Sequence, residues 1–462
     1  MKLLGRLLWL TVLLGAFYDA VEFIKPGLST ASLTVTDLLL TLVYLVWLFQ
    51  MSSGRLRLPR LSQYKALYLF IIMLLVPIPV GLMQGRLLQT VLRDARAPYY
   101  FVLSLVVMSF ATDEGAFKKL LKAFLVVGAL SLAVDYAVYI FKIPVATSLA
   151  FQELTTGRVS RHFGYASTFV LLLVCILLLV NYLFIMPDGR KRRKKAIAGL
   201  LLFVAGLCLT LIRGLFLGMV SGLVVAVLMQ KGKAKVPILV GMVLLIGCMA
   251  LLLHVASTEM TGTILRIPVV ERYVSIVDPS VTTYNSRGSA EGRIQAPGMI
   301  MKYGIQGHPV LGVGYGEFRK PRGQWDVVDP LLTLTVHSIM AWMLYKTGYV
   351  GTLVLLVCLL AFFIRGVRSF RLSAKRSWHK LGYGVASAFL AAIFVAGAGA
   401  NTMFGSERCS PLVAIMIGLL LCKPGKAEGV ETQVDLMSGS RPAKKAGPWQ
   451  GISAPGMTPP HL

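Results

Sequence analysis

Long apolar runs, separated by short polar segments, form the main pattern of this chain. Each run is long enough to cross or nearly cross the roughly 30 Å hydrocarbon core of a bilayer. The runs lie at 3–24, 34–51, 66–84, 98–112, 120–141, 164–186, 196–212, 214–230, 236–255, 348–365, 383–401 and 410–422. The pattern predicts an all-α polytopic membrane protein with about twelve transmembrane helices.

Composition and charge agree with a membrane protein. Hydrophobic residues make up 56% of the chain and charged residues 15%, and the mean hydropathy is +0.73, outside the range of soluble domains. If the runs alternate across the bilayer, the basic clusters fall on one side, at 55–60, 118–122, 189–195, 231–235 and 365–380. The positive-inside rule makes that side cytoplasmic, together with both termini. Topology therefore explains most of the net charge of +27, and without a nucleic-acid-binding motif we expect no nucleic-acid partner.

The runs also divide the chain into four parts. Residues 1–255 hold the first nine predicted spans, and residues 348–422 hold the last three. Between them, 256–347 is the largest extramembrane segment and is predicted to be a periplasmic catalytic loop. Residues 423–462 are rich in Gly, Pro, Ser and Lys, which predicts a disordered cytoplasmic tail.

Arginine dominates the basic residues of the predicted outer side. That side holds 13 Arg and 5 Lys, whereas the cytoplasmic side holds 12 Arg and 17 Lys. The positive-inside rule does not distinguish the two residue types, so the bias needs another cause. Guanidinium groups bind phosphate and carboxylate through two parallel hydrogen bonds and stay charged. The bias indicates an anionic ligand at the outer face.

One group of outer arginines lies on a predicted amphipathic helix at 85–100, in the outer interface. Its polar face carries Arg86, Arg93 and Arg96, and its apolar face carries Leu87, Leu88, Val91, Leu92 and Ala95. Contact with lipid phosphate is the simpler explanation for Arg86 and Arg96.

Three more outer arginines stand next to predicted spans. Arg158 and Arg161 precede the span at 164–186, where lipid contact and ligand binding are equally good explanations. Arg213 lies in the tight turn between two spans. An ionisable residue so close to membrane depth is a functional-site candidate by default.

The stretch "GHPVLGVGYGEF" at 307–318 concentrates four glycines in an otherwise apolar chain. A dinucleotide-binding loop would need a strand–turn–helix setting that the surrounding sequence lacks. Two interpretations remain open. Gly312, Gly314 and Gly316 take positive φ and let amide groups approach a ligand, or the segment is a tight loop. The loop would be anchored by Val310, Leu311, Val313 and Phe318.

The apolar segment at 333–346 follows this stretch and is predicted to be a helix on the outer surface. Counting it as a further span would place the basic cluster at 365–380 outside, against the charge rule.

Together these motifs resemble the O-antigen ligase and polymerase superfamily of bacterial envelope enzymes. The stretch at 307–318 is similar to the family's "hPllGvGyGnf" pattern, and His337, Gly348 and Gly351 are similar to its "aHNxyL…GxxG" pattern. Arg293 in "EGRIQAPGM" and Arg213 in "LTLIRGLFLG" match family arginines. The segment "RVSRHFGYAS" is less closely similar to another family pattern. The chain departs from these patterns at Ser338, where asparagine is usual, and at Ile212, where serine is usual.

The resemblance implies a fold similar to the GT-C membrane glycosyltransferases, with interfacial helices in the periplasmic loop. It implies a bacterial inner-membrane enzyme that transfers a glycan from an undecaprenyl diphosphate carrier at the periplasmic face. The acceptor is the lipid A core in the ligase branch and another lipid-linked glycan in the polymerase branch. Membrane lipids surround the protein.

The residues suggest how such a transfer would proceed. The outer segments lack a carboxylate cluster typical of a metal site, so we expect no metal or other cofactor. Arg213 and Arg293 would stabilise the leaving diphosphate, assisted by Arg158 or Arg161 and by Arg93. His337 is the best candidate for the base that accepts the acceptor's proton. Glu317, which is also a candidate for substrate binding, and Glu291 are alternative bases.

A transporter or flippase of lipid-linked oligosaccharide is the main alternative, because it also needs many spans and basic residues for a diphosphate. Such a protein would be expected to show repeat symmetry or a charged path across the membrane. The sequence shows no evident repeat, and its unexplained charge gathers on one side.

Overall fold

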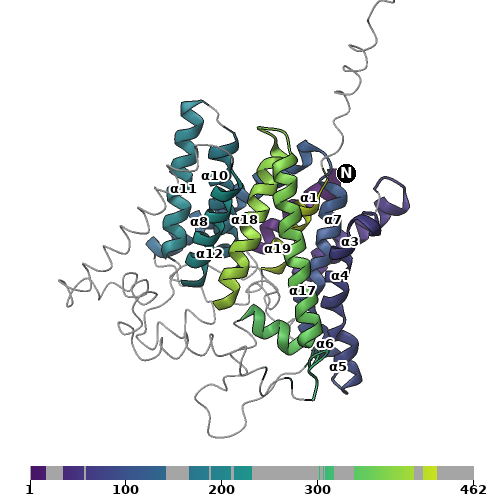
Figure 1. Ribbon diagram of the computed structural model, residues 1–462. Coiled ribbons are helices and arrows are strands. Elements are labelled where there is room, and N and C mark those ends of the chain that lie inside the picture. Colours follow the sequence, from purple (N-terminus) through teal and green to yellow (C-terminus); the bar gives the residue numbers. More distant parts are fainter. Residues whose placement is uncertain are drawn as a thin grey trace, which may run out of the picture. The chain divides into compact units, whose positions relative to one another are not determined.

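The computed structural model describes residues 2–16, 35–56, 59–141, 166–186, 189–209, 213–230, 301, 305, 307–316, 338–399 and 409–423. Within these residues every regular element is a helix. In chain order (Figure 1) they are α1 (Lys2–Ala16), α3 (Val35–Ser52), η1 (Leu61–Gln63), α4 (Lys65–Leu75), α5 (Pro77–Met83), α6 (Leu88–Tyr99), η2 (Tyr100–Val102), α7 (Leu103–Phe110), α8 (Glu114–Phe141), α10 (Ala166–Ile185), α11 (Arg190–Leu209), α12 (Arg213–Met229), α17 (Ile339–Leu372), α18 (Trp378–Gly399) and α19 (Ser410–Leu421). The all-α prediction is confirmed for this part of the chain.

Five helical segments are long and apolar enough to cross a membrane. They are Val35–Ser52, Lys65–Met83, Thr168–Ile185, Ile339–Leu372 and Trp378–Gly397. Shorter apolar helices cover Leu3–Leu14, Gly214–Met229 and Ser410–Leu421. The chain is therefore a membrane protein with multiple apolar helices. Of the twelve predicted spans, 236–255 lies outside the described residues.

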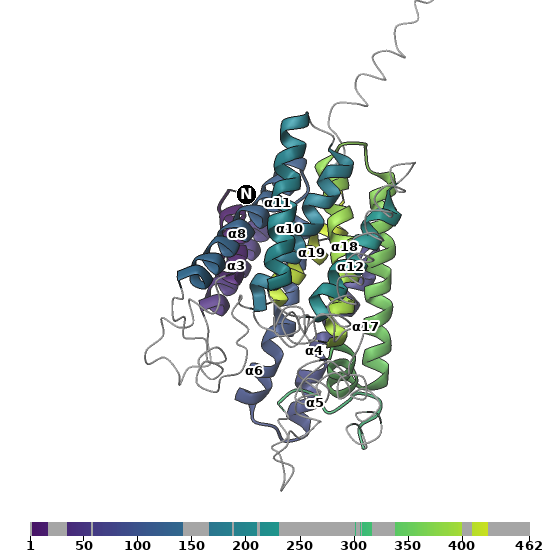
Figure 2. The ribbon, with the colours of Figure 1, turned by 90° about the vertical axis from the view of Figure 1, so that its left-hand side faces the viewer.

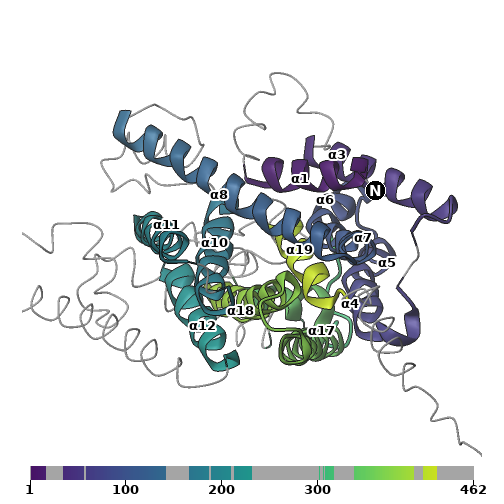
Figure 3. The same cartoon turned by 90° about the horizontal axis from the view of Figure 1, so that it is seen from above.

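Helix α18 lies between α12 and α17 and contacts both (Figure 3). A row of small residues lets α12 approach α18 closely: a Cβ placed on Gly218 would lie 2.6 Å from the carbonyl oxygen of Ala392. Gly214 and Gly222 meet the Ala396 and Ala388 carbonyls in the same way, at 3.1 and 3.0 Å. Such small-residue seams are typical of helix packing in membranes, where close backbone approach replaces the hydrophobic effect.

Three of the basic clusters, at 55–60, 118–122 and 365–380, share one end of the helix bundle, which we call the basic end (the described residues of 55–65, 113–122, 365–380 and 422–423). Arg365 stacks 4.2 Å from the ring centroid of Tyr64 and donates a hydrogen bond to the Gln63 carbonyl. At the start of α18, the Trp378 amide donates to the Glu114 carboxylate at 2.8 Å. These contacts join segments far apart in sequence at one end of the bundle.

The amphipathic helix predicted at 85–100 is present as α6. Val91 and Ala95 are buried on its apolar face, but Leu87, Leu88 and Leu92 are 73%, 57% and 54% exposed. The prediction of a separate interfacial helix needs one correction. α6 runs without a loop through η2 into α7, because Tyr100 and Leu103 keep right-handed helical backbone angles. The amphipathic segment is therefore the first part of a longer helix.

The longest helix, α17, is bent near its start. Gly348 has non-helical backbone angles, φ 66° and ψ −168°, and divides a short arm (339–347) from a long shaft (349–372). Figure 1 shows the arm turned away from the shaft at its lower end. The helix predicted at 333–346 corresponds to this arm over its described residues, and the kink falls where the span 348–365 was predicted to begin.

A candidate active site at the loop end

The glycine-rich loop 307–316 docks at the end of the bundle opposite the basic end, beside α5, α6 and the arm of α17 (Figure 2). We call this region, which comprises residues 77–96, 307–316 and 338–348, the loop end. At the junction of α4 and α5, Val76 keeps helical backbone angles, but Pro77 and Pro79 lack the amide hydrogens that a regular helix would use.

The loop fills the break in α17 from both sides. The amides of Val313 and Gly314 donate to the Tyr345 and Lys346 carbonyls, at 2.9 and 3.2 Å, at the end of the arm. Across the kink, the amides of Tyr349 and Val350 donate to the Pro309 and Val310 carbonyls, at 2.9 and 3.3 Å. A helix that is broken leaves backbone groups without intrahelical partners. The loop supplies those partners, so loop and kink form one structural unit.

Glycine is required where the two backbones meet. Gly312 and Gly348 both have positive φ, 70° and 66°. A Cβ on Gly312 would lie 2.5 Å from the Gly348 nitrogen, and one on Gly348 would lie 2.5 Å from the Gly312 nitrogen. Ordinary carbon contacts are about 3.5–4.0 Å. The two motifs that carry the resemblance therefore touch each other through their glycines.

Tyr315 attaches the loop to the junction of α4 and α5. Its amide donates to the Pro77 carbonyl at 2.9 Å and its hydroxyl to the Leu74 carbonyl at 2.7 Å. The side chain is fully buried, and burial raises the pKa of the hydroxyl well above its ordinary value, with a further contribution from the Asp94 carboxylate. Gly81 makes room for this contact, because a Cβ there would lie 2.2 Å from the Tyr315 carbonyl oxygen.

Two ion pairs fix α6 on different sides. The Lys346 ammonium lies 2.5 Å from Asp94 Oδ2, and the Gly316 amide donates to the same oxygen at 3.1 Å. Arg96 Nε lies 3.3 Å from Asp37 Oδ2 of α3, whose carboxylate also accepts a hydrogen bond from the Tyr100 hydroxyl. The ion pair explains Arg96 without lipid phosphate. α6 thus joins α3 to the loop and to the arm of α17.

The glycine-rich stretch can now be assigned a structural role. All five amides from Gly312 to Gly316 donate to protein acceptors, that of Gly312 to the His308 carbonyl at 2.9 Å. These contacts favour the tight-loop interpretation over a ligand cradle for this stretch. The predicted anchors need correction: Val313 is buried, but Val310 and Leu311 are 57% and 44% exposed. Tyr315 is the main anchor in their place, and Phe318 lies outside the described residues.

Half of the predicted site residues fall outside the described residues, namely Arg158, Arg161, Arg293, Glu317 and His337. Arg93 is described and exposed on α6. For Arg213 the structure gives the backbone, which begins α12. Ser338, the neighbour of His337, is buried and caps α17: its hydroxyl accepts a hydrogen bond from the Ala341 amide. Since serine and asparagine are about equally good N-caps, the departure from the family pattern at this position preserves the cap.

The starts of α12 and α17 meet at the end of α18. Gly214, next to Arg213, packs against the carbonyl of Ala396. The following residue, Gly397, packs against Ile339, whose Cδ1 would lie 2.0 Å from a Cβ on that glycine. Two helix N-termini that adjoin predicted catalytic residues therefore contact consecutive residues of one helix.

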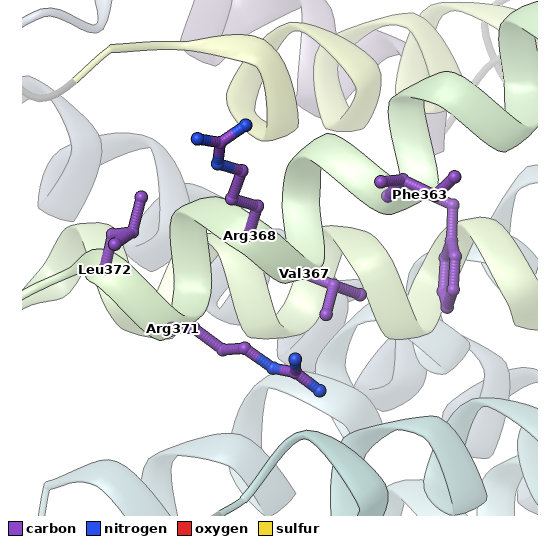
Figure 4. Close-up of a pocket in the computed structure, with 6 residues that line it drawn as sticks. Phe363, Val367, Arg368, Arg371 and Leu372 are labelled. Carbon is purple, nitrogen blue, oxygen red and sulfur yellow. The ribbon is translucent and has the colours of Figure 1, made fainter.

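An open groove of about 360 Å³ lies at the other end of α17, lined by Phe363, Ile364, Val367, Arg368, Arg371 and Leu372. In Figure 4 the side chains of Arg368 and Arg371 extend away from each other, so they do not converge on one ligand. Its place at the basic end separates it from the loop end. Among the described residues, no group of three or more His, Cys, Asp or Glu side chains is arranged to hold a metal ion.

A comparison with known families bears on the segments that form this loop end. Residues 198–356 match the family model described as O-antigen ligase. The match includes α12, the glycine-rich loop and the arm of α17. The match supports the resemblance of this part of the chain to the O-antigen ligase and polymerase superfamily. No curated protein matches the chain.

Sequence analysis did not identify three residues of the loop end, namely Gly81, Asp94 and Lys346. Asp94 stands among arginines in "LRDARA", and Lys346 is the sole charged residue between 338 and 364. A charge inside an apolar segment needs a partner, and that was the available signal. The sequence does not say that these two residues, 252 positions apart, are partners. Gly81 follows "PIPV", where the prolines indicate a helix break.

Proposed function

We propose that this protein is a member of the O-antigen ligase superfamily that transfers a glycan from an undecaprenyl diphosphate carrier to an acceptor hydroxyl at the periplasmic face of the bacterial inner membrane. The acceptor is the lipid A core or a growing lipid-linked polysaccharide. The observation that carries the proposal is the meeting of the α12 and α17 starts at Ala396 and Gly397. Helix α12 begins at Arg213 and α17 begins two residues after His337 in the sequence, so this contact supports a shared site for the two residues.

The location suits a diphosphate. Helix N-termini carry partial positive charge and unpaired amides, which favour anions, and Arg213 adds a full charge at the first residue of α12. Arg213 and Arg293 would stabilise the charge that develops on the diphosphate as the sugar leaves, at about 1.5–3 kcal/mol per charge-assisted hydrogen bond. Arg93, Arg158 and Arg161 would hold the rest of the carrier headgroup.

The acceptor hydroxyl must lose its proton as it attacks the sugar. His337 would accept that proton, since imidazole titrates near neutral pH. Glu317 would be the alternative base, because it directly follows the docked Gly316. This reaction needs no metal or cofactor in the proposed form, because the arginines supply the electrostatic stabilisation.

The test is an assay of the purified full chain with a diphosphate-linked glycan and an acceptor, without ATP. Transfer of the glycan supports an enzyme, and its absence together with passage of the lipid across vesicles supports a flippase. His337→Ala and Arg293→Ala should abolish transfer while the protein still inserts and folds. Arg371→Ala, which removes an exposed arginine at the basic end, is the matched control and should leave transfer unchanged. Wild-type rates in both His337→Ala and Arg293→Ala would refute the assignment.

A further inference from the structure

The carboxylate of Asp94 is where three segments of the loop end meet. Its Oδ2 receives the ammonium of Lys346 at 2.5 Å and the amide of Gly316 at 3.1 Å. The side chains of Lys346 and Asp94 are only 5% and 14% exposed. One oxygen atom thus connects α6, the loop and the arm of α17.

Each connected segment leads directly to a predicted site residue. On α6, Asp94 follows the exposed Arg93. In the loop, Gly316 immediately precedes Glu317. On the arm, Lys346 lies two turns from the capping residue Ser338, which follows His337. A shift of the carboxylate would therefore move α6 relative to the loop and the arm.

We propose that Asp94 is a positioning residue for glycan transfer, which holds the glycine-rich loop and the arm of α17 in register through Gly316 and Lys346. The inference rests on the proposed function, because the position of the loop and the arm is argued to matter for glycan transfer. It does not place Asp94 on the substrate. Lys346, which is buried and paired, is likewise a structural cation in this arrangement.

An ionised carboxylate is needed for both contacts. An asparagine oxygen would still accept the Gly316 amide, but it would remove the negative charge that the buried Lys346 ammonium contacts, which is unfavourable. The arm would then lose its ionic contact with α6, whereas the loop would keep its hydrogen bond to residue 94. Combining Asp94→Asn with Lys346→Met removes the buried ammonium together with the carboxylate.

The ion pair of Asp37 with Arg96 offers a matched control. It also fixes α6, through a carboxylate that is 11% exposed, but this carboxylate lies on α3 and contacts Arg96 and the Tyr100 hydroxyl. Asp37→Asn should therefore destabilise the protein without moving the loop or the arm.

The experiment compares the full-length wild type, Asp94→Asn, the double variant Asp94→Asn/Lys346→Met and Asp37→Asn in lipid nanodiscs. It measures kcat, the donor KM, the unfolding temperature, and hydrogen–deuterium exchange of peptides covering 307–316 and 338–348. We expect Asp94→Asn to lower kcat about 10- to 100-fold, the loss typical of a misplacement of about 1 Å. The donor KM should stay within about threefold of wild type, and exchange should rise in both peptides.

The double variant separates positioning from stability. It should recover much of the unfolding temperature, since neutral replacements for a buried pair are often tolerated, and yet keep the low kcat. Recovery of kcat together with stability would overturn the proposal, as would an equal loss of kcat in Asp37→Asn. If Asp94→Asn yields no folded protein, Asp94→Glu supplies the same comparison, because it keeps the charge and displaces the carboxylate by one methylene.

The exchange measurement does not depend on the reaction. If the wild type transfers no glycan, the proposed function fails. Increased exchange in Asp94→Asn would then show only that Asp94 connects α6 to the loop and the arm. The positioning role in glycan transfer would be refuted together with the proposed function. If the wild type is active and neither kcat nor exchange changes in Asp94→Asn, the positioning role alone is refuted.

Discussion

Replacing Gly348 by alanine tests the idea that the loop and the kink are one unit. The residue has φ 66° and ψ −168°, a region that is essentially restricted to glycine and costs other residues about 1–3 kcal/mol. The added methyl would also lie 2.5 Å from both the Gly312 nitrogen and the Val310 carbonyl oxygen. Relief of that overlap by movement of the loop adds about 1–3 kcal/mol.

The two contributions together give about 2–6 kcal/mol, a large part of the roughly 5–15 kcal/mol that stabilises a typical folded protein. Gly307→Ala is the matched control. Gly307 also has positive φ, 89°, but a Cβ there meets no atom within 4 Å. Its substitution should cost only the backbone term, about 1–2 kcal/mol.

The buried cysteines provide the assay. Cys175, Cys358, Cys409 and Cys422 are all buried free thiols, so a thiol-reactive fluorogenic dye reports their exposure as the protein unfolds on heating. Gly348→Ala should unfold at a clearly lower temperature than Gly307→Ala. Equal unfolding temperatures would refute the close approach as the reason for glycine at this position.

Four further results are expected. Gly312→Ala combined with Gly348→Ala should lower the free energy of unfolding by about 0.5–3 kcal/mol less than the sum of the two single changes, because both methyls enter the same contact. Additive losses would contradict this. Ser338→Asn should leave stability near wild type and Ser338→Ala should lower it by about 0.5–2 kcal/mol, measured by the same dye assay; equal effects would remove the capping explanation. Tyr315→Phe should cost about 1–3 kcal/mol through the lost hydrogen bond to Leu74. Since burial raises the pKa of Tyr315, this difference should persist at neutral pH and begin to shrink only above about pH 10, so its disappearance at pH 8 would refute the assigned cause.

The helices themselves could be predicted because their cause is local. Apolar runs indicated helices, and helices occupy the described part of every predicted run apart from 236–255, which lies outside the described residues. The joint between α6 and α7 was missed because the polar half of 85–100 suggested an interface. Ala97 and Pro98, both buried, continue the helix instead.

The contacts of the loop end could not be predicted, because they join residues far apart in the chain. The sequence indicated that Gly312 and Gly348 matter, through resemblance, but the reason is a backbone contact between them. Periodicity likewise places Asp94 on α6 and Lys346 near α17 without showing that they pair. The excess of arginine over lysine in the outer segments favours ligand-binding arginines. Arg96, however, pairs with Asp37 inside the protein.

The shared backbone contact of Gly312 and Gly348 has a consequence for exchanging parts between superfamily members. In a graft that replaces 307–316 alone, the amides and carbonyls of the new loop would no longer form these hydrogen bonds on both sides of the kink in the recipient's α17. Gly81 and Asp94 would have to travel with the loop and the arm, because each touches the transplanted backbone. The smallest part that could be exchanged therefore consists of four segments. These are the helices that carry Gly81 and Asp94, the loop 307–316 and the arm of α17.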